Sequence, residues 1–219
     1  MYALVEDSSI TQIITNPKAM IIGDVRYPAK IFSLWSKSEL NAIGIYEVVT
    51  DSTNFKDEKW YINTNESFAF ADNQVTRSWG TATAKAHADT LWTEEDKTDD
   101  KIPEGKDVGD VAVKGLKTVL IEQLKSQVAN ELSKTDWYIT RNTEKSTAIP
   151  SSISTHRDSV RTKQAEMETA ITNASDTPAL ETLYTYVNTG TEENPVMERP
   201  LGELPILEIW CYQLLQQEM

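Results

Sequence analysis

The sequence predicts an α+β protein with a small β-rich N-terminal domain, an acidic linker and a C-terminal helical hairpin or bundle. Short β-branched and aromatic runs separated by turn residues fill residues 1–92. Residues 93–110 carry eight acidic and three basic residues and few apolar ones, which is typical of a linker or solvated loop. Across residues 111–190 the apolar positions recur with helical spacing. We expect residues 191–219 to form an extended apolar C-terminal segment.

The N-terminal domain is expected to contain two β-hairpins. The first joins residues 2–6 to residues 10–15 through a short polar turn. The second joins residues 67–71 to residues 74–79 through an Asp-Asn turn. Together the two hairpins would supply four strands of a small sheet.

Between the hairpins the sequence predicts one short helix and one strand. Ser36 and Glu39 have the spacing of a capping box, which marks the start of a helix. Gly44 is placed to end that helix. Residues 45–50 are a run of β-branched and aromatic residues, the strongest indication of a strand in the chain.

Aromatic residues are concentrated in the same domain, namely Trp60, Tyr61, Phe68, Phe70 and Trp79. We expect these side chains to pack the small sheet, because large aromatic side chains usually fill cores. The alternative is an exposed stacking platform for sugars or for a partner.

Three helices are expected after the acidic stretch. The first shows an apolar stripe at three- and four-residue spacing: Val113, Leu116, Leu120, Leu124, Val128 and Leu132. The second begins after Pro150, with Ser151 or Ser152 as its cap. The third opens at residues 176–178, buries Leu180, Leu183, Tyr184 and Val187, and ends at Gly190.

Composition excludes several classes of protein. The chain has 219 residues and a net charge of −13, so it repels nucleic acid and anionic lipid, and we expect neither as a partner. No apolar run approaches the ~18 residues of a membrane-spanning helix. The first residues lack the basic and apolar regions of a signal peptide. A single cysteine, Cys211, cannot form a disulfide within the chain.

The sequence offers no recognisable catalytic or cofactor motif, so we expect neither an enzyme nor a bound cofactor or metal. The two histidines, His87 and His156, are far apart, and a zinc site would have to combine them with Cys211 or carboxylates. Calcium is the alternative for Asp96, Asp99 and Asp100, but the ligand order and central glycine of an EF-hand are missing. The paired carboxylates lie in polar stretches, where nothing raises their pKa for acid catalysis.

The most specific segment connects the first two predicted helices. The first helix is expected to end near Lys134, after which residues 136–138 turn the chain and a loop of about ten residues crosses to the second helix. Trp137 and Ile149 would staple the helix ends, and Pro150 would lead into the second helix. In that helix Arg157 and Arg161 are four residues apart, so a guanidinium there could meet Asp136 and fix the loop.

This segment resembles the C-terminal helical hairpin of bacteriophage tail-fibre assembly chaperones and related phage tail proteins. The matching positions are Thr135, Asp136, Trp137, Ile149, Pro150, Arg157 and Arg161. His156 stands where a tyrosine is common in that pattern. The resemblance covers residues 111–173, and residues 27–48 look like the small N-terminal unit of the same class of environmental phage proteins.

The resemblance implies a non-enzymatic tail protein that binds a phage tail-fibre or baseplate protein. Such a chaperone would cover apolar surface of its unassembled partner in the host cytoplasm, and could stay on the virion tail. It would work as a hetero-oligomer, with a homo-oligomer as a further option. The alternatives are a permanent structural virion component (baseplate, fibre adaptor or fibre tip) and a glycan-binding receptor module, for which Trp60 and Trp79 would matter.

Four aromatic residues are the candidates for partner contact, because buried aromatic side chains dominate interface energies. Trp137 and Tyr138 lie in the segment between the first two helices, and Trp210 and Tyr212 lie in the apolar C-terminal segment. An apolar segment of that kind needs burial within the chain or in a partner.

Overall fold

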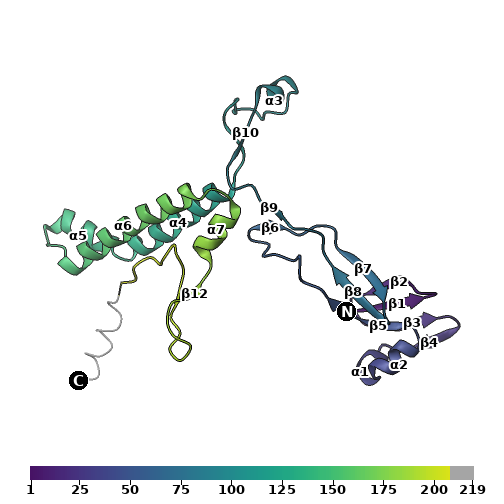
Figure 1. Ribbon diagram of the computed structural model, residues 1–219. Helices are drawn as coiled ribbons and strands as arrows, with labels where there is room; N and C mark the ends of the chain where they lie inside the picture. Colours follow the sequence, from purple (N-terminus) through teal and green to yellow (C-terminus); the bar gives the residue numbers. More distant parts are fainter. Residues whose placement is uncertain (208–219) are drawn as a thin grey trace. The chain divides into compact units, whose positions relative to one another are not determined.

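The computed structural model describes residues 1–207 and divides the chain into two compact units, between Ala84 and Lys85 (Figure 1). Both helices and strands are present, which confirms the predicted α+β class. The division precedes residue 92, where the sequence predicted the first domain to end.

The first unit is built mainly from strands. In chain order its elements are β1 (Tyr2–Glu6), β2 (Ser9–Ile14), β3 (Met20–Ile22), β4 (Val25–Tyr27), α1 (Ile31–Leu34), α2 (Lys37–Ala42), β5 (Ile45–Thr50), β6 (Tyr61–Ile62), β7 (Ser67–Ala71), β8 (Gln74–Ser78) and β9 (Thr83–Ala84). Five strands form one sheet in the order β2-β1-β5-β8-β7, in which only β5 and β8 are parallel. The outer strands β2 and β7 contact each other, so the sheet curls.

Both predicted hairpins are confirmed, with β1 paired to β2 and β7 paired to β8. Each turn places two consecutive residues at positive φ: Asp7 (49°) and Ser8 (62°), then Asp72 (53°) and Asn73 (57°). Turns of this kind match the right-handed twist of paired strands, and short polar side chains tolerate the left-handed conformation. The polar turn residues therefore fix the register of both hairpins.

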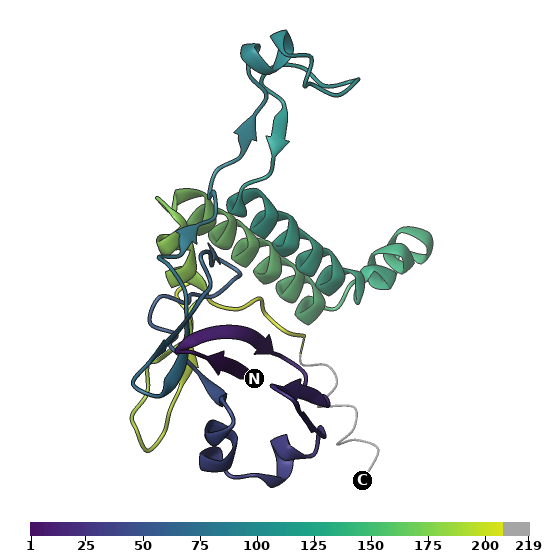
Figure 2. The same cartoon turned by 90° about the vertical axis from the view of Figure 1, so that its right-hand side faces the viewer.

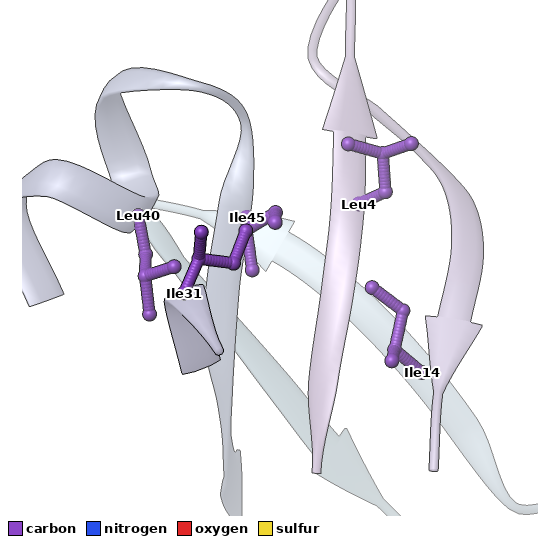
Figure 3. Close-up of a cluster of buried hydrophobic side chains, with 5 residues drawn as sticks. All are labelled: Leu4, Ile14, Ile31, Leu40 and Ile45. Carbon is purple, nitrogen blue, oxygen red and sulfur yellow. The ribbon is translucent and has the colours of Figure 1, made fainter. Parts of the chain in front are cut away.

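The sheet has an apolar cluster on each face, because β1 is apolar at successive positions that point to opposite sides. Leu4 faces the helices α1 and α2 and packs with Ile14, Ile31, Leu40 and Ile45 (Figure 3).

Ala3 and Val5 face the other way and pack with Val75, against which Phe68 and Phe70 are partly buried. Trp60 and Tyr61 are 3% and 5% exposed. The expectation that the aromatic residues of this unit are used for packing is thus confirmed for these four.

The predicted capping box is present at the start of α2, where Ser36 and Glu39 exchange side-chain and backbone hydrogen bonds. Gly44 follows the helix with φ +81°, and its carbonyl accepts a hydrogen bond of 2.8 Å from the Val5 N–H. A Cβ atom at residue 44 would lie 2.6 Å from the Val5 carbonyl oxygen. Glycine is therefore required here by both backbone conformation and close approach.

The second unit contains the helices. In chain order its elements are β10 (Thr90–Leu91), α3 (Glu94–Thr98), β11 (Val111–Val113), α4 (Leu116–Ser133), α5 (Asp136–Lys145), α6 (Ser151–Asn173), α7 (Thr177–Tyr184), β12 (Val187–Asn188) and β13 (Met197–Glu198). The helices α4 and α6 lie side by side in both views (Figures 1 and 2). Their buried apolar residues include Leu120, Leu124, Val128, Val160, Met167 and Ile171, so most of the stripe predicted for the first helix does form a core. Val113, expected in that stripe, instead belongs to β11 and is 64% exposed.

The acidic stretch 93–110 does not connect the two units. It lies between β10 and β11, which pair with each other, and it contains the short helix α3. We call residues 90–113 the acidic arm. The correction has a simple cause: the β-branched residues on either side of the stretch pair as a hairpin, so that its charges form the solvated end of that hairpin.

The start of α4 is capped by a residue from the other side of the acidic arm. The N-cap residue is Gly115, which has no side chain for this role. The Asp89 carboxylate accepts hydrogen bonds from the Gly115 N–H (2.7 Å) and the Thr118 hydroxyl (2.8 Å) instead. These bonds lower the pKa of Asp89, with the Gly115 N–H contributing most.

The later helix boundaries differ from the prediction. The N-cap of α6 is Pro150 and has no side-chain cap, so neither Ser151 nor Ser152 caps it. Asp176 caps α7, which ends at Tyr184, well before Gly190. Val187, expected to be buried in that helix, belongs to β12 and is 48% exposed. The hairpin β12–β13 replaces part of the predicted extended segment, because residues 187–188 and 197–198 pair across a polar loop.

Candidate partner-binding site

An aromatic surface on α5 is the candidate site. Trp137 is 51% exposed and Tyr138 is half-buried, and their ring centroids lie 3.8 Å apart. The Arg141 guanidinium lies 4.8 Å from the Trp137 ring centroid and 5.7 Å from that of Tyr138. These cation–π contacts order the rings at the surface, which lowers the entropic cost of using them to bind a partner. We call Trp137, Tyr138 and Arg141 the α5 platform.

The platform lies on a helix, although the sequence predicted a turn and a loop here. The hydroxyls of Thr140 and Thr143 donate hydrogen bonds to the carbonyls of Asp136 and Ile139, each four residues earlier. Ser146 at φ +53° ends the helix, and its N–H donates to the Asn142 carbonyl. Asn142 also holds the next residues through a hydrogen bond from its side chain to the Thr147 carbonyl. This polar segment is thus compatible with a helix whose threonines bond within it.

Arg157 of α6 fixes the start of α5. Its Nη1 lies within hydrogen-bond distance of the Leu132 carbonyl (2.8 Å), Thr135 Oγ1 (2.7 Å) and Asp136 Oδ1 (2.8 Å). Thr135 is fully buried, and the Arg157 side chain is only 10% exposed. The predicted contact between a guanidinium and Asp136 is therefore confirmed for Arg157, which ties together the end of α4 and the start of α5.

The other motif residues behave differently. Arg161 lies 3.5 Å from Asp158 on its own helix and is half exposed, so it does not share the role of Arg157. Pro150 begins α6 as its N-cap, as its position in the motif suggested. Ile149 is half-buried, and the predicted staple between Trp137 and Ile149 stays a prediction.

A buried polar pair, which sequence reasoning missed, lies beside this network. His156 Nε2 of α6 is 3.2 Å from Glu131 Oε1 of α4, and their side chains are 7% and 11% exposed. Lys134 also binds the Glu131 carboxylate. Both residues continue the apolar stripes at helical spacing, three positions after Val128 and Ile153, and this spacing was the signal that they face the helix pair.

The ionisation of Glu131 is set by its neighbours. Burial pushes the pKa of Glu131 up, but Lys134, the Leu207 N–H and the His156 ring together outweigh burial and hold this pKa below 4.5. The carboxylate is thus charged at neutral pH. It contacts Lys134 of the α4 end, His156 of α6 and the backbone N–H of Leu207, close to the junction with α5.

The aromatic residues of the first unit fit a glycan site poorly. Trp60 is 3% exposed and has no free ring face to offer to a sugar. The Trp79 ring lies 4.7 Å from the Phe55 ring, and the Arg77 guanidinium lies 4.4 Å from its centroid. Packing of this kind occupies the ring surface that a sugar would need.

Two of the predicted partner-binding residues, Trp210 and Tyr212, lie outside the described residues, as does Cys211. Within residues 1–207, no group of three or more His, Cys, Asp or Glu side chains is placed to hold a metal ion. In the same range, no helix combines the length and the apolar character needed to cross a membrane.

Comparison with protein-family models, curated proteins and solved structures finds no match to this chain. The functional reading of the α5 platform therefore depends on three local features: its exposure, the stacking of Arg141, and the anchoring of its helix by Arg157.

Proposed function

We propose that this chain is a non-enzymatic bacteriophage tail protein, and that it acts as a tail-fibre assembly chaperone by binding a fibre protein through the α5 platform. The observation that carries the proposal is the exposed Trp137 ring on a helix whose first residue, Asp136, is hydrogen-bonded to Arg157 of α6. The sequence resemblance around Asp136, Pro150 and Arg157 supplies the identity of the partner class.

The exposure of Trp137 supports a binding role, because a ring that is half exposed is not used to fill the core. A tryptophan ring buries a large apolar area on contact, and such residues carry much of the energy of protein interfaces. In this chain the ring is stacked on Tyr138 and Arg141, so binding would not have to order it first.

The buried network supports a scaffold role for the residues that match the phage pattern. Arg157 holds the carbonyl of Leu132, the hydroxyl of Thr135 and the carboxylate of Asp136, and all three lie directly before the platform. The motif residues would thus position the binding helix, and Trp137 and Tyr138 would contact the partner. No chemical step is required of a chaperone that acts by covering apolar surface.

Co-expression with the tail-fibre protein of the source phage tests the proposal. We expect the chain to raise the yield of soluble fibre protein and to co-purify with that identified protein. Trp137→Ala should weaken co-purification at least about tenfold, as expected for an interface hot spot. Leu34→Ala is the matched control, because Leu34 is also an exposed large apolar residue (74%) but lies in the first unit.

Mass spectrometry of purified particles then separates the two modes of tail association. A fixed copy number relative to the major capsid protein indicates a chaperone that is retained or a permanent virion component. Abundance in infected-cell lysate without a place in the particle indicates a transient chaperone. Production of the chain by cells without a phage genome, or fibre yields that do not respond to the chain, would refute the proposal.

A further inference from the structure

We propose that the chain associates with itself head to tail, with the acidic arm of one copy on the basic α5 end of the next. The basic end comprises residues 134–163, that is, the connection that follows α4, all of α5 and the first half of α6. This inference concerns the same platform as the proposed function but does not rest on it, because it is tested on the purified chain alone.

The basic end and the acidic arm carry opposite net charges. Residues 134–163 contain six basic and three acidic residues, a net charge of +3 in a chain of net charge −13. Residues 93–110 contain eight acidic and three basic residues, a net charge of −5. Two ion pairs lie within the arm, Lys97–Asp107 and Lys101–Asp99, and its net charge remains strongly negative after they form. A basic part of the protein is therefore complementary in charge to its own acidic arm.

Both surfaces also expose apolar residues. The paired strands at the base of the arm expose Leu91 (46%), Val111 (39%) and Val113 (64%). The basic end exposes Trp137 (51%) and Ile139 (38%). Each surface thus combines apolar side chains with a net charge, and the two net charges have opposite signs, as in an interface with an apolar centre and a charged rim.

The two surfaces lie at opposite ends of α4. Asp89, Gly115 and Thr118 attach the base of the arm to the start of α4, while α5 follows the end of that helix. An 18-residue helix is about 27 Å long at 1.5 Å per residue, so the two surfaces lie at opposite ends of α4. Figures 1 and 2 both show the arm extending away from α4 and α6. Two different surfaces at opposite ends produce a heterologous contact, which continues from copy to copy.

Lys145 and Arg141 are the basic residues best placed to contact the arm. They follow Trp137 at four-residue intervals, which places all three on one face of α5. Self-association would cover the platform, and a partner that binds the platform more tightly would displace the neighbouring copy.

Sedimentation equilibrium of the purified chain tests the inference. We expect the weight-average mass to exceed the 24.7 kDa of one copy and to rise with protein concentration at low salt. It should return toward one copy in about 0.5 M salt, because the charged contacts are then screened within a few ångströms. A mass of one copy at every concentration and salt would overturn the inference, including the case in which the arm folds onto its own α5.

Charge exchange identifies the two surfaces. Variant one carries Arg141→Glu and Lys145→Glu, and variant two carries Glu95→Lys and Glu104→Lys in the arm. Each alone should associate at least about tenfold more weakly than the wild type. Their equimolar mixture should regain association, since the arm of variant one and the α5 end of variant two are both unchanged and can still contact each other. Lys145→Glu alone serves if the double variant is misfolded by circular dichroism.

A matched control reverses the same number of charges elsewhere. Lys18→Glu with Arg26→Glu changes two exposed residues of the first unit and should leave association unchanged. If this control weakens association as much as variant one, or if the mixture of variants one and two stays dissociated, the contact between arm and α5 end is wrong. Association that persists in variant one would likewise assign self-association to another surface.

Discussion

Arg157 Nη1 lies 2.8 Å from Asp136 Oδ1, yet the two side chains differ sharply in exposure: 10% for the arginine and 60% for the aspartate. The two residues therefore depend on the ion pair to different extents. An exposed carboxylate gains little from an ion pair, because water screens it well. A buried guanidinium, in contrast, needs its acceptors, and the Leu132 carbonyl and Thr135 hydroxyl supply the other two.

Arg157→Lys should lower the free energy of unfolding by about 2–4 kcal/mol, because a lysine ammonium cannot reproduce the planar donor geometry and would be buried with poor contacts. Asp136→Asn should cost less than about 1 kcal/mol, since the amide oxygen can still accept the bond. Urea unfolding followed by circular dichroism at neutral pH measures both.

Arg161→Lys is the control for this prediction, since Arg161 is on the same helix and half exposed. It should change stability by no more than about 0.5 kcal/mol. Equal effects of the two Arg→Lys changes would mean that Arg157 does not anchor α5 in solution.

Gly44→Ala should destabilise the first unit by about 2 kcal/mol or more, because it adds the cost of the left-handed conformation to a contact of 2.6 Å with the Val5 carbonyl. Gly23→Ala is the matched control: Gly23 also has positive φ (56°), but a Cβ there meets no atom within 4 Å. It should cost about 1 kcal/mol, the conformational part alone. Thermal unfolding of both variants checks the difference, and equal costs would show that the Val5 carbonyl moves away freely.

The sequence predicted those parts of the fold that local residue patterns determine. Ser36 with Glu39, the turn at Asp72 and Asn73, and the apolar stripe through Leu120 each specify their structure within a few residues. Arg157 could be linked to Asp136 because both flank the same helical connection.

The missed features depend on contacts between distant residues. Nothing near Asp89 shows that it caps a helix whose N-cap residue, Gly115, lies 26 positions later. The pairing of β10 with β11 across an acidic stretch could not be distinguished from a linker by composition alone. Glu131 and His156 continue the apolar stripes by spacing, but residues of these types are usually exposed, and only the packing of α4 on α6 shows that both are buried.

Asp89→Asn should destabilise the second unit at neutral pH and have little effect in acid. Hydrogen bonds from the Gly115 N–H and the Thr118 hydroxyl hold the pKa of Asp89 below its ordinary value of 3.8 in the folded chain. A group whose pKa is lower when folded stabilises the fold above the unfolded pKa, and this contribution disappears as the pH falls through the folded pKa. The unfolding midpoints of wild type and variant should therefore differ at pH 6 and converge below about pH 3.

Asp24→Asn is the control for the cap, since Asp24 is an exposed residue in the turn between β3 and β4. It should leave the wild-type pH dependence in place. A difference between wild type and Asp89→Asn that stays constant from pH 6 to about pH 2.5 would show that the carboxylate charge is not what caps α4.

A double-mutant cycle tests whether Glu131 and His156 interact as a pair. Glu131→Gln and His156→Phe should each lower stability by about 1–3 kcal/mol, because each leaves its buried partner without a proper contact. The double variant should be about 1 kcal/mol more stable than the sum of the single effects, since residues in contact are not additive. Glu122→Gln, on the same helix but exposed, is the control and should stay within about 0.5 kcal/mol of the wild type.

The pH dependence of this cycle separates a charged pair from mere packing. Because the pKa of Glu131 is held below 4.5 in the folded chain, its carboxylate stabilises the fold above that pH and loses this contribution as the pH falls further. The effect of Glu131→Gln should accordingly shrink between pH 7 and about pH 3. An effect of the same size at both pH values would mean that Glu131 contributes shape alone, and that Lys134 and the Leu207 N–H gain nothing from its charge.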